Sequence, residues 1–162
     1  RFAAANPRYN ILFGSVSISR DYRMISKNLM VEFLKQHKLN PELSRLVSAK
    51  NPYRIWGNIG FDKEMLCSPN SDIDDISVLI SEIEKDGKKV PVLLRHYLKL
   101  NAELIGFNVD KNFSDVLDGL IRVDLTRTDP KLLKRFMGDR GFGEFAEYHA
   151  IPTGNASCPP NP

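Results

Sequence analysis

Six side chains in the sequence carry groups that suit ligand binding or proton transfer, and they fall in two short stretches. These are Ser15, Ser17, Arg20, Tyr22, Arg95 and Tyr97. A guanidinium can anchor an anion and a phenol can donate a proton, so Arg95 and Tyr97 form the candidate catalytic pair. The four earlier residues are candidate substrate-binding groups. Simpler roles stay open for all six, because the serines can face solvent and both tyrosines have the spacing of core residues.

Other catalytic arrangements are absent from the sequence. The histidines, His37, His96 and His149, are scattered and form no nucleophile–base pair. No Gly-x-Ser-x-Gly turn occurs, which argues against a serine hydrolase. The glycines from Gly138 to Gly143 follow a predicted helix rather than a strand, which is the wrong context for a phosphate-binding loop.

No metal site and no disulfide framework are expected. Asp72, Asp74 and Asp75 lie together, but no glycine-centred calcium loop surrounds them, and they are better explained as capping the helix that follows. Cys67 and Cys158 belong to no Cys-x-x-Cys or Cys–His cluster. We therefore expect reduced thiols, with a disulfide bridge as the minority alternative.

Three stretches rich in apolar residues are predicted to be β-strands. They are residues 9–18, 103–109 and 117–125. The first is nearly continuous in apolar residues over one half, which is typical of a strand inside a sheet. Its candidate buried residues are Ile11, Phe13, Val16 and Ile18. In the third strand, Asp118 and Asp124 alternate with the apolar positions and are expected to point outward rather than into a site.

Apolar residues at helical spacing predict five helices. Their ranges are 21–38, 41–47, 72–86, 91–100 and 131–137. Ser19 or Asp21 is expected to cap the first helix, because such side chains accept hydrogen bonds from free backbone N–H groups. Asn40 is expected to cap the second and Ser71 the third. The fourth helix begins at Pro91 and is expected to turn a broad apolar face inward.

A helix followed by two strands, in the stretch 91–125, predicts an α/β layer in which the helix covers one face of a sheet. The expected fold class is α/β, with a partial mixed sheet of about three strands flanked by helices. Residues 1–150 are expected to form one domain or a piece of one, and residues 151–162 a mobile tail. Residues 48–70 are expected to be a surface loop or insertion that covers a pocket or packs on the domain. The chain begins without Met, which suggests a segment cut from a longer protein.

The charge distribution limits the classes of partner. The chain of 162 residues has a net charge of +3, but residues 1–60 carry 10 Lys and Arg against 3 Asp and Glu. Such a basic stretch can lie near anionic lipid headgroups or an acidic carrier protein, or it can be an ordinary solvated surface. No zinc-finger or RNA-recognition signature occurs, so nucleic acid is not an expected partner. No apolar run is long enough to span a bilayer, and no signal peptide is visible.

Several segments together resemble one family of bacterial proteins. They are Leu12–Ser19, Asp21–Tyr22, the proline-led helix Pro91–Leu100, the turn Gly106–Asp110 and the motif Phe113–Asp118. Over residues 9–149 the chain resembles bacterial proteins that carry a haemolysin label. These proteins belong to the GNAT-like N-acyltransferase superfamily and are relatives of the ornithine-lipid acyltransferases.

The resemblance implies the C-terminal part of a GNAT-like acyltransferase domain, and with it a GNAT-like fold. Such an enzyme transfers a fatty acyl group, from acyl carrier protein or acyl-CoA as co-substrate, to an amine of a lipid precursor. The family's donor-binding loop is not found in this sequence, so the chain is expected to be inactive alone, with that loop upstream. The first strand would face the acyl-pantetheine chain. No further cofactor is expected, and the implied location is the cytoplasm, with peripheral contact with the inner membrane.

Two other interpretations compete with this one. The chain can be a non-catalytic module that binds an acyl chain or carrier protein, or that docks a neighbouring acyltransferase domain. A literal pore-forming haemolysin is disfavoured, because the sequence shows no membrane-compatible amphipathic segment, no glycine-rich calcium repeats and no secretion signal. An exposed sheet edge would also allow a homodimer through strand exchange.

Overall fold

The computed structural model describes residues 2–55 and 72–152. The chain divides into two compact units. Residues 13–123 form the sheet unit, and residues 1–12 together with 124–162 form the terminal unit. In the described part the fold is mixed α/β, with a three-stranded antiparallel sheet flanked by helices. The predicted α/β class is confirmed at this level.

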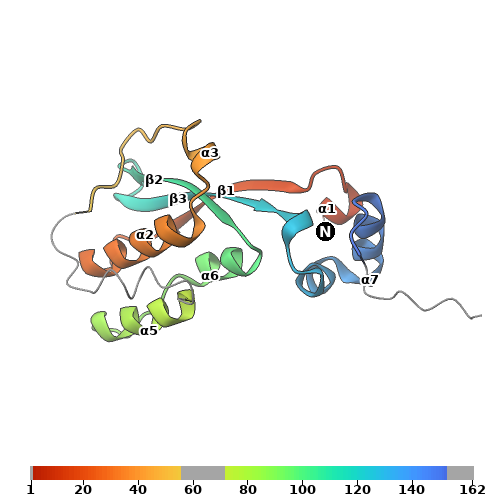
Figure 1. The fold of residues 1–162 in the computed structure, drawn as a ribbon. Helices are drawn as coiled ribbons and strands as arrows, with labels where there is room; N and C mark the ends of the chain where they lie inside the picture. The colour runs from red at the N-terminus through yellow and green to blue at the C-terminus, as the bar shows by residue number, and fades with distance from the viewer. Residues whose placement is uncertain (1, 56–71, 153–162) are drawn as a thin grey trace, which may run out of the picture. The chain divides into compact units, whose positions relative to one another are not determined.

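The sheet contains β1 (Ile11–Ile18), β2 (Glu103–Asp110) and β3 (Val116–Asp124), as Figure 1 shows. The strands are hydrogen-bonded in the order β1-β3-β2. All three predicted strands are confirmed, and β1 lies in the same sheet as the later pair. β1 stands at one end of this order, so the expected inner position is not found among the described strands.

One face of the sheet is apolar and buried, and the other is polar. On the buried face Leu104 of β2 lies opposite Ile121 of β3. On β1 only Val16 and Ile18 are buried. Phe13, predicted to be buried, is 62% exposed. Because side chains alternate along a strand, Phe13 shares the polar face with the serines of β1.

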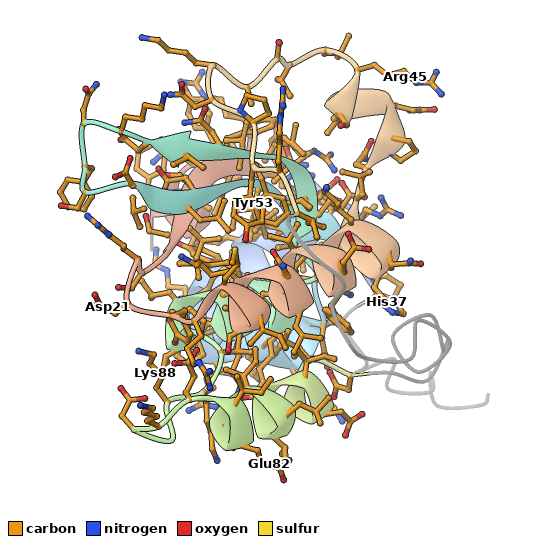
Figure 2. The ribbon with its side chains drawn as sticks, turned by 90° about the vertical axis from the view of Figure 1, so that its left-hand side faces the viewer. Asp21, His37, Arg45, Tyr53, Glu82 and Lys88 are labelled. Carbon is orange, nitrogen blue, oxygen red and sulfur yellow. The ribbon has the colours of Figure 1, made fainter. Side chains whose placement is uncertain are left out.

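Two helices cover the buried face in successive layers. α2 (Met24–Lys38) packs against β2, and α5 (Ile73–Ile83) packs against α2. Both views show the sheet, α2 and α5 following one another in this order (Figures 1 and 2). The side chains at the centre of this core are fully buried; they include Leu29, Phe33, Ile76, Ile80 and Leu94.

The predicted cap of α2 is wrong. The N-cap residue is Arg23, whose side chain makes no cap hydrogen bond. Instead, Oε1 of Glu84 accepts the Arg23 backbone N–H at 2.8 Å. The Ser19 hydroxyl donates to Asp21 at 3.1 Å rather than capping the helix. A capping group that comes from 61 residues away is not visible in the local sequence.

The ends of α5 and of α3 (Pro41–Ser44) also differ from the predicted ones. α5 is capped by Asp72 in a reciprocal capping box with Asp75, and the predicted cap at position 71 lies outside the described residues. α5 ends at Ile83, before the predicted residue 86. The predicted cap of α3 is confirmed, since Asn40 Oδ1 accepts the Leu43 N–H at 2.9 Å, but the helix ends three residues earlier than expected.

The inward face of α6 (Val92–Lys99) is narrower than predicted. Leu94 is the buried residue of this helix, whereas Val92 and Leu93 are each 64% exposed. A helix of eight residues has little more than two turns, so few of its side chains can meet the core at once.

The terminal unit contains α1 (Phe2–Ala5), the short 3-10 helix η1 (Leu125–Arg127) and α7 (Pro130–Tyr148). Gly138 interrupts α7 with a φ of 79° and a ψ of 168°, where the sequence predicted the helix to end. The chain then returns to helix up to Tyr148. α1 packs on α7 within this unit.

Some predictions fall on residues that the structure does not describe. They concern the Trp56 region within residues 56–71, both cysteines, and the tail beyond residue 152. In the described ranges, none of the helices combines the length and the hydropathy that crossing a membrane requires.

Candidate functional site

The polar face of the sheet holds a pocket of about 490 Å³, which we call the sheet-face pocket. All three strands contribute to it, and the last residue of α3 together with the chain that follows forms its remaining wall. Its strand residues are Ser15, Ile105, Gly106, Phe107, Asn108, Asp118 and Leu120. Its other residues are Ser44 and Val47 to Lys50. The pocket therefore lies wholly within the sheet unit.

The sheet register brings an acid, an amide and a hydroxyl to this face. Asn108 of β2 lies directly opposite Asp118 of β3. From the other side, the Ser17 hydroxyl of β1 donates a hydrogen bond to Asp118 Oδ1 at 2.5 Å. Ser15 lines the pocket two residues earlier on the same strand face. A hydroxyl of β1 thus contacts the carboxylate of β3, and an amide of β2 lies opposite that carboxylate in the register.

The wall opposite the strands is the segment from Asn40 to Asn51, which is fixed to β2 at both ends. At the first end, the Asn40 backbone N–H donates to the Leu104 carbonyl at 2.8 Å. At the second, the Asn51 backbone N–H donates to Asn108 Oδ1 at 2.8 Å, and the Val109 N–H donates to the Asn51 carbonyl at 2.8 Å. We call residues 40–51 the anchored segment.

The pocket combines one carboxylate, that of Asp118, and one ammonium, that of Lys50, with apolar walls. Asp118 is half-buried and has a second carboxylate oxygen beyond the one that Ser17 contacts. An ionised carboxylate accepts hydrogen bonds only, so a ligand ammonium is a suitable partner for that oxygen. Ile105, Leu120 and Val47 supply apolar surface. The pocket thus suits an amphiphilic amine.

Of the predicted substrate-binding residues, Ser15 lines this pocket, and Ser17 is connected to it through its hydrogen bond to Asp118. Arg20 and Tyr22 lie beyond the end of β1 and do not line it. The Tyr22 hydroxyl donates to the Lys89 carbonyl at 2.5 Å. Burial, and then the nearby carboxylates of Glu84 and Asp86, raise the pKa of the Tyr22 phenol above its usual value of 10.0.

The predicted catalytic pair on α6 does not line the sheet-face pocket. Arg95 is held by Asp74 of α5, with an Nη2 to Oδ1 distance of 2.6 Å. Tyr97, half-buried on the same helix, is likewise not among the pocket residues. The bond between Arg95 and Asp74 links α6 to α5, which gives this guanidinium a structural role.

Asp118 and Asn108 are the site residues that sequence reasoning missed. Asp118 was expected to point outward, and it does lie on the face away from the core. That face carries the pocket, because the anchored segment covers part of it. The alternation of Asp118 with apolar residues indicates which face of the strand it lies on. The sequence does not show that Asn108 lies opposite it in the sheet or that Ser17 is hydrogen-bonded to it.

Two smaller cavities lie elsewhere in the sheet unit. One, of about 410 Å³, lies among α2, α5 and α6, and its lining includes His37, Asp74 and Lys99. The other, of about 320 Å³, is lined in part by Lys27, Arg54 and Tyr53. In the described ranges no group of three His, Cys, Asp or Glu side chains is placed to hold a metal ion.

A scan against protein-family models found no match, and neither a search of curated proteins nor one of solved structures found any. The function must therefore be inferred from the site itself.

Proposed function

We propose that this chain is the C-terminal part of a GNAT-related N-acyltransferase. In this proposal the enzyme transfers a fatty acyl group from acyl carrier protein to an amine of a lipid precursor, in the cytoplasm at the surface of the inner membrane. The observation that carries the proposal is the Asp118 carboxylate, hydrogen-bonded by Ser17, in a pocket with apolar walls. A carboxylate in such a pocket matches an acceptor that is cationic at one end and apolar at the other.

Asp118 has a defined task in this reaction. It binds the acceptor as an ammonium ion and then accepts one of its protons, because only a neutral amine attacks a thioester. The amine nitrogen forms a bond to the acyl carbon, the carbon–sulfur bond breaks, and the nitrogen loses a second proton. One of the two protons goes to the leaving thiolate and the other is released to solvent. Ser17 orients the carboxylate through its 2.5 Å hydrogen bond.

The donor is proposed to lie beside β1. β1 pairs with β3 on one side, and no described strand pairs with its other side. Free backbone groups on such an edge can hydrogen-bond the amides of a pantetheine arm, as they would a further strand. The donor-binding loop is proposed to lie upstream, so the chain alone is inactive.

The test is an acyl-transfer assay on the full-length natural polypeptide, with acyl carrier protein as donor and a set of amphiphilic amines as acceptors. Asp118→Asn is expected to lower kcat/KM by about 100-fold or more, the usual loss for a general base. Asp115→Asn is the matched control, because Asp115 is exposed and Asn tolerates its positive φ of 52°. The control variant should keep full activity.

Two results would overturn parts of the proposal. Full activity of Asp118→Asn, with unchanged thermal unfolding, would remove the proposed role of the sheet-face pocket. Acyl transfer by the 162-residue chain alone would overturn the claim that the donor loop lies upstream.

One observation favours a non-catalytic alternative, a module that binds an acyl chain or carrier protein. Arg95 and Tyr97 do not line the sheet-face pocket, so it lacks the predicted catalytic pair. Calorimetric titration of the full-length protein distinguishes the two functions. Saturable binding of an amphiphilic amine, lost in Asp118→Asn but without turnover under any donor, would support the binding module.

A further inference from the structure

The anchored segment exposes apolar side chains at its middle. Leu46 is 79% exposed and its neighbour Val47 is 44% exposed. Both follow the single turn of α3, where the Leu46 N–H donates to the Leu43 carbonyl at 3.0 Å. A leucine so fully exposed beside a second apolar residue gains nothing from the fold in this position.

The same segment carries exposed cations. Arg45 and Lys50 flank the two apolar residues, and neither forms an ion pair with any described residue. Figure 2 shows Arg45 extending away from the body of the sheet unit. The one acidic side chain within residues 40–51 is Glu42, so the segment keeps a net positive charge.

The exposed residues belong to a segment whose two ends are fixed by hydrogen bonds. Asn40 and Asn51 fix the two ends of the segment to β2, through the backbone and side-chain hydrogen bonds described above. Asn51 Nδ2 adds a further bond to the Val109 carbonyl at 3.2 Å. A segment fixed at both ends loses little conformational entropy when its middle binds a surface.

We infer that the anchored segment docks on an anionic lipid bilayer. Leu46 and Val47 enter the boundary between headgroups and acyl chains, while Arg45 and Lys50 meet the lipid phosphates. Two apolar residues on a projecting turn form a patch far smaller than the roughly 800 Å² that each partner buries in a stable protein complex. A fluid, negatively charged surface fits such a patch better than a folded acidic protein does.

Docking by this segment also concerns the sheet-face pocket. Ser44, Val47 and Lys50 line that pocket, so the docked segment would bring its wall to the headgroup region. An amphiphilic amine could then enter from the bilayer without leaving it. This consequence rests on the proposed function, whereas the docking itself does not.

The experiment is co-sedimentation of the purified full-length protein with lipid vesicles. Vesicles of phosphatidylcholine mixed with phosphatidylglycerol are compared with vesicles of phosphatidylcholine alone, at low and high salt. We expect binding to the mixed vesicles and its loss at high salt, because the cations supply part of the attraction.

Variants assign the binding to the anchored segment. Leu46→Ser should weaken binding to mixed vesicles by about tenfold, the loss expected for one buried leucine. Arg45→Gln and Lys50→Gln should each weaken it by about fivefold. The matched controls are Leu93→Ser on α6, an equally suitable exposed leucine, and Lys89→Gln; both should bind as the unaltered protein does.

Each outcome bears on the inference. Equal binding to both kinds of vesicle, or losses in the control variants as large as in the Leu46 variant, would overturn it. So would binding of acyl carrier protein that depends on Arg45 and Lys50 while no vesicle binds. Circular dichroism melts of every variant confirm that folding is retained, and the assay needs no enzymatic activity, so it can fail independently of the proposed acyl transfer.

Discussion

Glu84 offers the sharpest test of how the sheet unit is held together. It lies just after α5, its side chain is only 3% exposed, and its Oε1 accepts the Arg23 N–H at the start of α2 at 2.8 Å. Its Oε2 lies 3.6 Å from Lys88 Nζ. The Arg23 guanidinium also donates to the Ile83 carbonyl at 3.0 Å. One carboxylate therefore joins α2 to the end of α5.

The cost of removing this carboxylate follows from its contacts. A hydrogen bond to a charged group contributes about 1.5 to 3 kcal/mol, and this one also places negative charge at the positive end of α2. The ion pair with the partly exposed Lys88 adds less than about 1 kcal/mol. Glu84→Ala should therefore lower the free energy of unfolding by about 3 kcal/mol, or the melting temperature by roughly 6 to 12 °C. Glu84→Gln keeps the acceptor oxygen and should cost about 1 kcal/mol.

The assay is urea unfolding followed by far-ultraviolet circular dichroism, with Glu82→Ala as the matched control. Glu82 is an exposed carboxylate on α5, labelled in Figure 2, and its removal should change stability by less than about 0.5 kcal/mol. If Glu84→Ala and Glu82→Ala lose the same small amount, the cap supplied from a distant element does not stabilise α2. If the loss of unfolding free energy in Glu84→Gln lies between the losses in Glu84→Ala and Glu82→Ala, the contribution of the hydrogen bond can be separated from that of the charge.

Two further predictions concern a phenol and a glycine. Because the folded state raises the pKa of Tyr22 above about 10, its contribution to stability should be complete below the unfolded pKa and disappear as the pH rises through the folded one. Measured by urea unfolding over that alkaline range, the stability advantage over Tyr22→Phe should shrink with pH, and a constant difference would contradict the reasoning. Gly138→Ala should destabilise the terminal unit by about 1 to 3 kcal/mol, because a φ of 79° with a ψ of 168° is nearly restricted to glycine. Gly143→Ala, at an open helical position, is its control and should be neutral or slightly stabilising in the same melts.

The strands could be predicted because their signal is local. Apolar residues are concentrated in residues 103–110 and 116–124, and from Leu117 onward the buried residues of β3 alternate with less buried ones. The same reasoning failed for Phe13, since a strand at the end of the sheet order need not bury both faces. It also failed for the start of α2, whose capping acceptor, Glu84, belongs to a distant part of the chain.

Only part of the candidate site could be predicted from the sequence, because its residues come from strands that are distant in the chain. Ser15 and Ser17 stood out as hydroxyls on a strand; Ser15 lines the sheet-face pocket, and Ser17 is hydrogen-bonded to its carboxylate. Asp118 became the partner of Ser17 only because β1 and β3 are neighbours in the sheet, which no local pattern encodes. Arg95 and Tyr97 were chosen for their chemistry, but Arg95 proves to join two helices through Asp74.

An irregularity in β2 explains why the pocket forms where it does. The register between β2 and β3 shifts between Leu104 and Gly106, which leaves Ile105 as an extra residue. Bulges of this kind redirect side chains and are common beside binding sites. The anchored segment attaches to β2 on both sides of this shift, at Leu104 and at Asn108. The added residue, Ile105, thus lies in the pocket lining, between the two points at which the anchored segment is fixed to the strand.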